Sequence, residues 1–139
     1  KLASQAMAAG EVPVGAVIVS AAGDIIAGSE NRMQRDNDAT AHAEILAIRQ
    51  AISVLGTSRL MGCDLWVTLE PCAMCAGAIS HARIRRLYFA ASDEKGGAVE
   101  HGPCLFSQPT IHHKPDLYGG ISEAPAAQLL RTFFATKRG

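Results

Sequence analysis

The sequence predicts an α/β fold, a three-layer α/β/α sandwich built around a five-stranded mixed sheet. Short apolar segments rich in β-branched residues alternate along the chain with segments whose apolar residues recur at helical spacing. The first two strand segments are separated only by a short turn, which is typical of a hairpin, whereas the later ones have longer connections that allow parallel pairing. Because the chain has 139 residues, we expect one domain over residues 1–139.

The expected strands are short and apolar, and they cover residues 12–20, 25–28, 65–69, 85–91 and 117–121. Helices are expected between and around them, over residues 2–9, 41–55, 71–82 and 122–136. Thr40 is expected to cap the second helix, and Gly56 is expected to end it. Pro71 fits the first position of the third helix, so Cys72 and Cys75 would lie one turn apart at its start.

Composition and cysteine usage narrow the class of protein. The net charge is zero, so charge gives no overall evidence for a nucleic-acid partner. No apolar run approaches the roughly 20 residues of a membrane span, and we expect no membrane association. Four cysteines, two of them in a Cys-x-x-Cys pair, are more typical of metal binding in a reducing compartment than of a disulfide framework. We therefore expect a cytoplasmic protein.

Two short segments supply a set of metal-binding side chains. His42 and Glu44 lie in the sequence TAHAE, and Cys72 and Cys75 lie in EPCAMC. One imidazole and two thiolates can hold Zn²⁺ and leave the fourth tetrahedral position open to water, as in catalytic zinc sites, whereas a structural site would have a fourth protein ligand. The spacing therefore predicts one Zn²⁺ per chain, held by His42, Cys72 and Cys75.

Glu44 follows the histidine by two residues, close enough to reach a water at the open position without binding the metal. The joint pattern His-x-Glu followed by Pro-Cys-x-x-Cys is typical of zinc-dependent nucleobase deaminases. In this chemistry the glutamate takes a proton from the attacking water and returns it to the substrate. The sequence thus predicts hydrolytic deamination, with Glu44 as the proton shuttle.

Several further segments resemble one family closely. They are VPVGAV (12–17), NR (31–32), TAHAEI (40–45), VTLEPCAMCAGAI (67–79), RIRRLYFAASDEKGGA (83–98) and LLRTFFATKR (129–138). The chain is similar over nearly its whole length to the bacterial tRNA-specific adenosine deaminases, of the zinc-dependent cytidine and deoxycytidylate deaminase superfamily. The resemblance implies the cytidine deaminase-like fold.

The resemblance also implies a substrate and its binding residues. The substrate would be adenosine at the wobble position (34) of an arginine tRNA, and the product would be inosine. The enzyme would be a homodimer in which both subunits hold the anticodon stem-loop. Asn31 matches the residue that hydrogen-bonds the target base. The pocket walls are matched by Val14, Ala43 and Leu69. A loop that contacts the RNA is matched by Asp93 and Lys95.

Alternatives remain at this point. A guanine deaminase or another free-base or nucleoside deaminase would share the zinc motif but need no RNA. A non-catalytic zinc subunit of an editing complex would have no use for Glu44. Asn31 could instead be favoured because asparagine tolerates turn geometry.

The closing helix carries three basic residues that are expected to contact phosphates rather than to take part in the chemistry: Arg131, Lys137 and Arg138.

Overall fold

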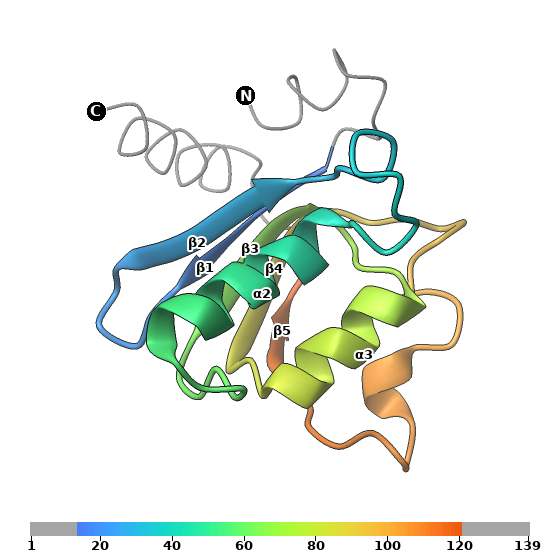
Figure 1. The fold of residues 1–139 in the computed structure, drawn as a ribbon. Helices are drawn as coiled ribbons and strands as arrows, with labels where there is room; N and C mark the ends of the chain where they lie inside the picture. The colour runs from blue at the N-terminus through green and yellow to red at the C-terminus, as the bar shows by residue number, and fades with distance from the viewer. Residues whose placement is uncertain (1–13, 121–139) are drawn as a thin grey trace.

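The computed structural model describes residues 14–120. Five strands form one sheet in the order β2-β1-β3-β4-β5 (Figure 1). The strands are short: β1 (Gly15–Val19), β2 (Ile25–Glu30), β3 (Asp64–Leu69), β4 (Arg86–Ala91) and β5 (Asp116–Tyr118). β1 is antiparallel to both of its neighbours, and β3, β4 and β5 are parallel. The predicted hairpin and the predicted parallel pairing are confirmed.

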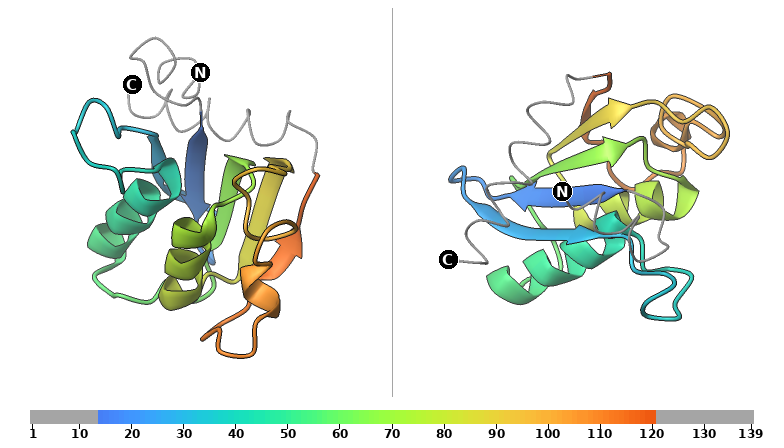
Figure 2. Two further views of the ribbon diagram at one scale, coloured as in Figure 1. Left: turned by 90° about the vertical axis from the view of Figure 1, so that its right-hand side faces the viewer. Right: turned by 90° about the horizontal axis from the view of Figure 1, so that it is seen from above.

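Two helices, α2 (Ala43–Leu55) and α3 (Ala73–Ala82), lie side by side on one face of the sheet (Figures 1 and 2). The strands alternate their side chains, so every second residue faces these helices. Leu65 and Val67 on β3, with Leu87 and Phe89 on β4, are fully buried there and belong to one hydrophobic core. Within residues 14–120, no helix is long and apolar enough to cross a membrane.

The opposite face of the sheet carries a ladder of aromatic rings across three strands. Trp66 and Tyr88 occupy paired positions on β3 and β4, and their ring centroids are 3.9 Å apart. Tyr118 on β5 continues the ladder, with its ring 4.8 Å from that of Tyr88. The third layer of the predicted sandwich requires the helices expected over residues 2–9 and 122–136, which lie outside the described residues.

The two helices begin later than the sequence predicts. Thr40 does not cap α2; its hydroxyl donates a hydrogen bond to Asp38 (2.7 Å), and His42 occupies the N-cap position with an extended backbone. Likewise α3 begins at Ala73, with Cys72 rather than Pro71 preceding it as the N-cap. At α2 both the N–H (2.9 Å) and the hydroxyl of Thr40 donate hydrogen bonds to Asp38, which keeps Thr40 in a turn before the helix. The side chains of His42 and Cys72 make no capping hydrogen bond, and they face each other.

The ends of the helices agree better with the local sequence. Gly56 ends α2 in a left-handed conformation (φ 69°), and its N–H donates to the carbonyl of Ile52. Glycine adopts this conformation without steric cost, which is why the end of α2 is predictable. The last strand also differs from its prediction over 117–121. β5 starts one residue earlier, at Asp116, and ends at Tyr118.

Candidate active site

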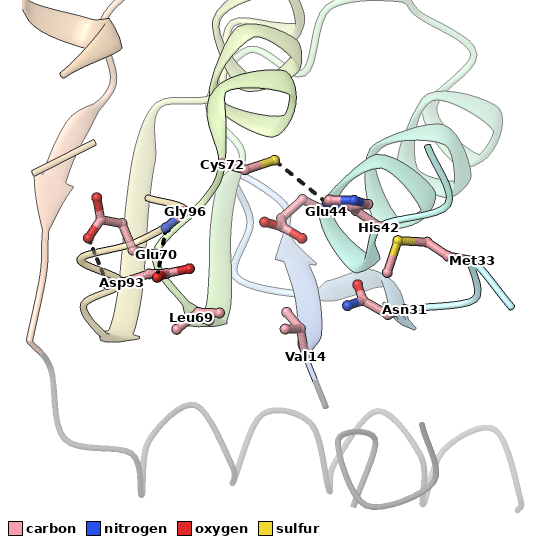
Figure 3. A pocket seen from close by; sticks show the side chains of 10 residues that line it. All are labelled: Val14, Asn31, Met33, His42, Glu44, Leu69, Glu70, Cys72, Asp93 and Gly96. Atoms are coloured by element: carbon pink, nitrogen blue, oxygen red, sulfur yellow. Dashed lines mark hydrogen bonds between the residues drawn. The ribbon is translucent and has the colours of Figure 1, made fainter. Parts of the chain in front are cut away.

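A pocket opens where the chain leaves the sheet toward the two helices (Figure 3). Its volume is about 170 Å³. That is several times the roughly 30 Å³ share of one water in the liquid, so the pocket can take a larger group. Ten residues line it: Val14, Asn31, Met33, His42, Glu44, Leu69, Glu70, Cys72, Asp93 and Gly96. Ligand sites of open α/β sheets lie at this position, outside the carboxyl ends of strands.

Three potential metal ligands meet at one side of the pocket. The Nδ1 atom of His42 lies 3.5 Å from the sulfur of Cys75 and 3.7 Å from that of Cys72. A tetrahedral zinc with ordinary bond lengths would place an imidazole nitrogen about 3.6 Å from a thiolate sulfur. The three donors therefore fit Zn²⁺ in both chemistry and spacing. Among the described residues, no other group of three potential ligands lies this close together.

The two thiols differ in their tendency to ionise. A hydrogen bond from the thiol of Cys75, together with backbone N–H groups at the start of α3 and the nearby His42, lowers the pKa of Cys72 to about 5. The same hydrogen bond and burial raise the pKa of Cys75. Cys72 therefore ionises more readily than Cys75. A bound dication would favour ionisation of both, because a metal binds the thiolate and not the thiol.

Glu44 lies in the first turn of α2 and is buried, with 4% of its surface exposed. It lines the pocket beside His42 and Cys72 but is not one of the three clustered ligands (Figure 3). Burial is the main cause that raises the pKa of Glu44 to about 7. Its carboxyl group therefore stands next to the metal-binding side chains, within the same cavity.

Asn31 follows directly after β2 and is also buried, with 4% exposed. Its side-chain oxygen accepts a hydrogen bond of 2.7 Å from the N–H of Ala43, the first residue of α2. Asn31 is not among the residues with a left-handed backbone, whereas Asn37 in the following loop is (φ 49°). A left-handed turn therefore does not explain why position 31 is asparagine. The hydrogen bond from the Ala43 N–H to the Asn31 side chain, which holds the start of α2, does explain it.

The structure brings most of the predicted site residues together. Val14 and Leu69 provide apolar pocket walls, and Asp93 lines the pocket from the loop after β4. Ala43 is fully buried and contributes its backbone N–H, and Lys95 is exposed and does not line the pocket.

Three lining residues are absent from the sequence-based prediction: Met33, Glu70 and Gly96. Only Glu70 carries a local signal, because a charged residue stands between an apolar strand and Pro71. Burial alone would raise the pKa of Glu70, but hydrogen bonds from the N–H of Asp93, from the His101 side chain and from the N–H groups of Glu100 and Val99 outweigh it. The pKa falls to about 2, so this buried side chain is a carboxylate at neutral pH.

Comparison with known proteins gives a consistent result. Residues 1–91 match the family of the cytidine and deoxycytidylate deaminase zinc-binding region. A tRNA-specific adenosine deaminase of Agrobacterium fabrum (strain C58 / ATCC 33970) is 61% identical over 128 residues, which cover 92% of this chain and 84% of that protein.

Two solved structures share the architecture. One comes from a study of A-to-I editing by tRNA:A34 deaminases at the wobble position of transfer RNA; it has a TM-score of 0.85 and 58% identity over 91% of both chains. The other is a guanine deaminase from Bacillus subtilis, with a TM-score of 0.64 and 35% identity over 99% of this chain and 88% of that one. From its fold, its ligand cluster and these similarities, the chain belongs to the zinc-dependent cytidine and deoxycytidylate deaminase family and, within it, groups with the tRNA-specific adenosine deaminases.

Proposed function

We propose that this protein converts adenosine to inosine at the wobble position (34) of a tRNA by hydrolytic deamination. The observation that carries the proposal is the pocket in which Glu44 adjoins the cluster of His42, Cys72 and Cys75. The 61% identity to a tRNA-specific adenosine deaminase supports the choice of substrate.

His42, Cys72 and Cys75 would hold the zinc, since their spacing fits a tetrahedral ion. When bound, zinc supplies a water whose pKa is about 7 instead of about 16, and so a nucleophile at neutral pH. A carboxylate oxygen of Glu44 takes one proton from the water as the water oxygen bonds to C6 of the adenine ring, and it gives this proton to N1. Glu44 then takes the second proton from the new hydroxyl group and gives it to the amine, so that the C6–N bond breaks, ammonia leaves and a carbonyl remains at C6.

The remaining pocket residues would hold the base. Val14 and Leu69 offer apolar contacts to its faces, and the Asn31 side chain offers polar contacts to its edge. We also assign Ala43, Asp93 and Lys95 to the substrate-binding region: Ala43 holds Asn31, and the other two lie on the loop after β4. A base must leave its stack to enter such a pocket, and an anticodon loop presents unstacked bases at low cost.

Following the family resemblance, we infer that the substrate is the anticodon stem-loop of an arginine tRNA and that residues 1–139 act as one domain. Cysteines that bind a metal must stay reduced, which suits a reducing compartment, so we place the reaction in the cytoplasm. Arg131, Lys137 and Arg138, the expected phosphate contacts, lie outside the described residues.

We further propose a homodimer in which a second copy covers the outer faces of α2 and α3. Val54, Leu55 and Met74 on these helices are exposed by 62%, 42% and 38%. An apolar groove between the helices is lined in part by Ile48 and Ala78, which share a helix face with Leu55 and Met74 respectively. Exposed apolar side chains beside a groove are typical of protein interfaces. A solution mass of two chains is expected, and the mass of one chain would contradict the dimer.

A guanine deaminase is the second candidate, because the structure of such an enzyme from Bacillus subtilis shares the fold and 35% identity. The two functions separate in one assay. We expect the purified protein to release ammonia from a tRNA with adenosine at position 34, and to leave guanine, cytosine and free adenosine unchanged. Turnover of guanine without RNA would favour the second candidate.

The metal site can be tested by cysteine substitution. We expect one zinc per chain by metal analysis, and we expect Cys72→Ser and Cys75→Ser to lose it, because each removes one of three protein ligands. Cys104→Ser is the matched control, since Cys104 lies outside the ligand cluster and its thiol donates to the carbonyl of His101. Full zinc content in Cys75→Ser would contradict the ligand assignment.

The role of Glu44 can be tested with the neutral variant of nearly the same volume, Glu44→Gln. It is expected to keep its zinc and its fold but to lose about 10²- to 10⁴-fold in kcat, the usual contribution of general acid–base catalysis. Steady-state kinetics and metal analysis on the same sample give both quantities. If the variant retains normal turnover, Glu44 does not move the protons.

Asn31 has two separable tasks, one for each end of its amide. Asn31→Asp keeps an oxygen for the Ala43 N–H, at a helix N-terminus that favours negative charge, but it removes the amide donor. We expect tRNA turnover to fall by about 5- to 150-fold, equivalent to about 1–3 kcal/mol, with thermal stability near that of the wild type. Asn31→Ala should lose turnover and also about 1–3 kcal/mol of stability, because the Ala43 N–H loses its partner. Wild-type turnover in Asn31→Asp would exclude a role for its amide donor in base recognition.

A further inference from the structure

Glu70 begins the connection from β3 to α3, ahead of the cysteines, and its side chain accepts hydrogen bonds from the loop that follows β4. It directly follows β3 and is buried, with only 2% of its surface exposed. One carboxylate oxygen accepts hydrogen bonds from the N–H of Asp93 (3.0 Å) and from Nδ1 of His101 (2.8 Å). The other accepts from the N–H groups of Val99 (3.0 Å), Glu100 (2.9 Å) and His101 (3.1 Å).

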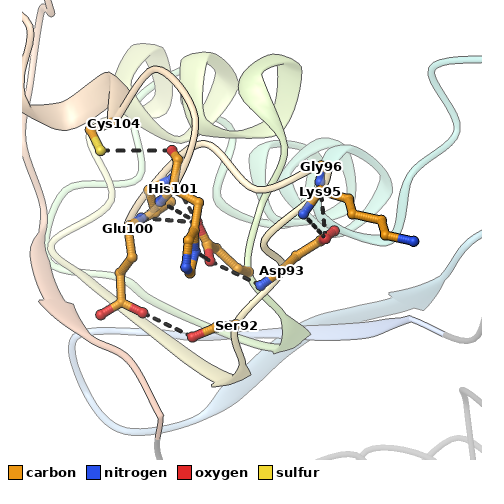
Figure 4. A network of polar contacts seen from close by, with 9 residues as sticks. Ser92, Asp93, Lys95, Gly96, Glu100, His101 and Cys104 are labelled. Atoms are coloured by element: carbon orange, nitrogen blue, oxygen red, sulfur yellow. Dashed lines mark hydrogen bonds and ion pairs between the residues drawn. The ribbon is translucent and has the colours of Figure 1, made fainter.

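All five hydrogen bonds come from residues 92–101, which we call the β4 loop (Figure 4). The loop is also attached beside Glu70, because the N–H of Ala98 donates to the carbonyl of Pro71 (2.9 Å). Cys72, a zinc ligand, is the next residue. The β4 loop is thus held against the segment that leads into the metal site.

The packing around the carboxylate leaves no spare room. A Cβ atom added at Gly97 would lie 2.5 Å from the carboxyl carbon of Glu70 and closer still to the carbonyl oxygen of Asp93. Both distances are far below ordinary van der Waals contact. Glycine at position 97 therefore lets the loop close over the buried carboxylate.

The same loop forms one wall of the pocket. Asp93 and Gly96 line the cavity, and the carboxylate of Asp93 accepts hydrogen bonds from the N–H groups of Lys95 (3.1 Å) and Gly96 (2.9 Å). Asp93 therefore shapes the tip of the loop, and Glu70 fixes both ends of it.

We propose that Glu70 is a positioning residue for the deamination: it holds the β4 loop in the shape that forms the substrate-facing wall of the pocket. This inference rests on the proposed function. Glu70 acts through the β4 loop rather than on the reacting atoms. Only a carboxylate suits the position, because five donors converge on its two oxygens. Glutamine would turn an NH₂ group toward N–H donors, and a buried donor without an acceptor is costly.

The first test is Glu70→Gln, with Glu94→Gln as the control that makes the same change of charge at an exposed position of the same loop. We expect Glu70→Gln to raise KM for the tRNA at least tenfold while kcat stays within about threefold and zinc content is unchanged. Amide hydrogen exchange over residues 97–101 should become faster. Glu94→Gln should leave all of these quantities unchanged. An unchanged KM, or a loss of zinc together with kcat, would overturn the proposal.

A second variant keeps the carboxylate and displaces it. Gly97→Ala should give the same rise in KM and the same faster exchange, because its methyl group does not fit between the Glu70 carboxylate and the carbonyl of Asp93 and must separate the loop from Glu70. Gly77→Ala is its control, since a Cβ there meets nothing within 4 Å. Wild-type exchange and KM in Gly97→Ala would contradict the role of Glu70 even if Glu70→Gln failed to fold. Because exchange needs no substrate, it tests the hold on the loop even if the wild type fails to deaminate tRNA, which would be a failure of the proposed function alone.

Discussion

The whole site depends on one constraint: His42 must meet Cys72 and Cys75 within a few ångströms. The two cysteines follow the histidine by 30 and 33 residues in the sequence. The sheet topology satisfies it. β1 lies between β2 and β3 and is antiparallel to both, so β2 and β3 run in the same direction and end at the same edge. α2 follows β2 and α3 follows β3, and the N-cap residues of the two helices, His42 and Cys72, therefore face each other.

This arrangement has an electrostatic consequence. The N-termini of two helices carry partial positive charge and favour thiolates, which offsets part of the cost of ionised sulfur in a half-buried site. Glu44, buried beside Cys72, works in the opposite direction, because two anions at close range repel each other. A bound dication relieves this repulsion, so metal binding and stability of the pocket are linked.

Much of the fold follows from local sequence, and the reasons for the exceptions are physical. The alternation of apolar segments predicts the hairpin and the parallel strands, and a glycine that tolerates a left-handed backbone marks the end of α2. The predicted helix starts are too early, because Thr40 and Pro71 are the stronger local start signals. In the structure Thr40 is held in a turn by Asp38, and the N-cap residues are His42 and Cys72. The metal-ligand cluster itself is predictable, because ligand type and spacing are encoded directly in the sequence.

The role of Glu70 could not be read from the sequence in the same way. Its partners come 23 to 31 residues later, from a segment with no periodic pattern, and four of its five hydrogen bonds come from backbone N–H groups that carry no sequence signature. Asn31 is similar, since its oxygen binds an N–H group 12 residues away. Long-range contacts to the backbone are set by tertiary structure, which a single sequence does not reveal.

The aromatic ladder on the face opposite α2 and α3 provides an optical probe. Trp66 is the only tryptophan of the chain, and it stacks on Tyr88 at the centre of the ladder, away from the metal-binding side chains. A stacked indole in a fixed environment gives a near-ultraviolet circular dichroism signal that disappears when tertiary packing is lost. Emission excited selectively at the indole of Trp66 therefore reports on the packing between β3 and β4.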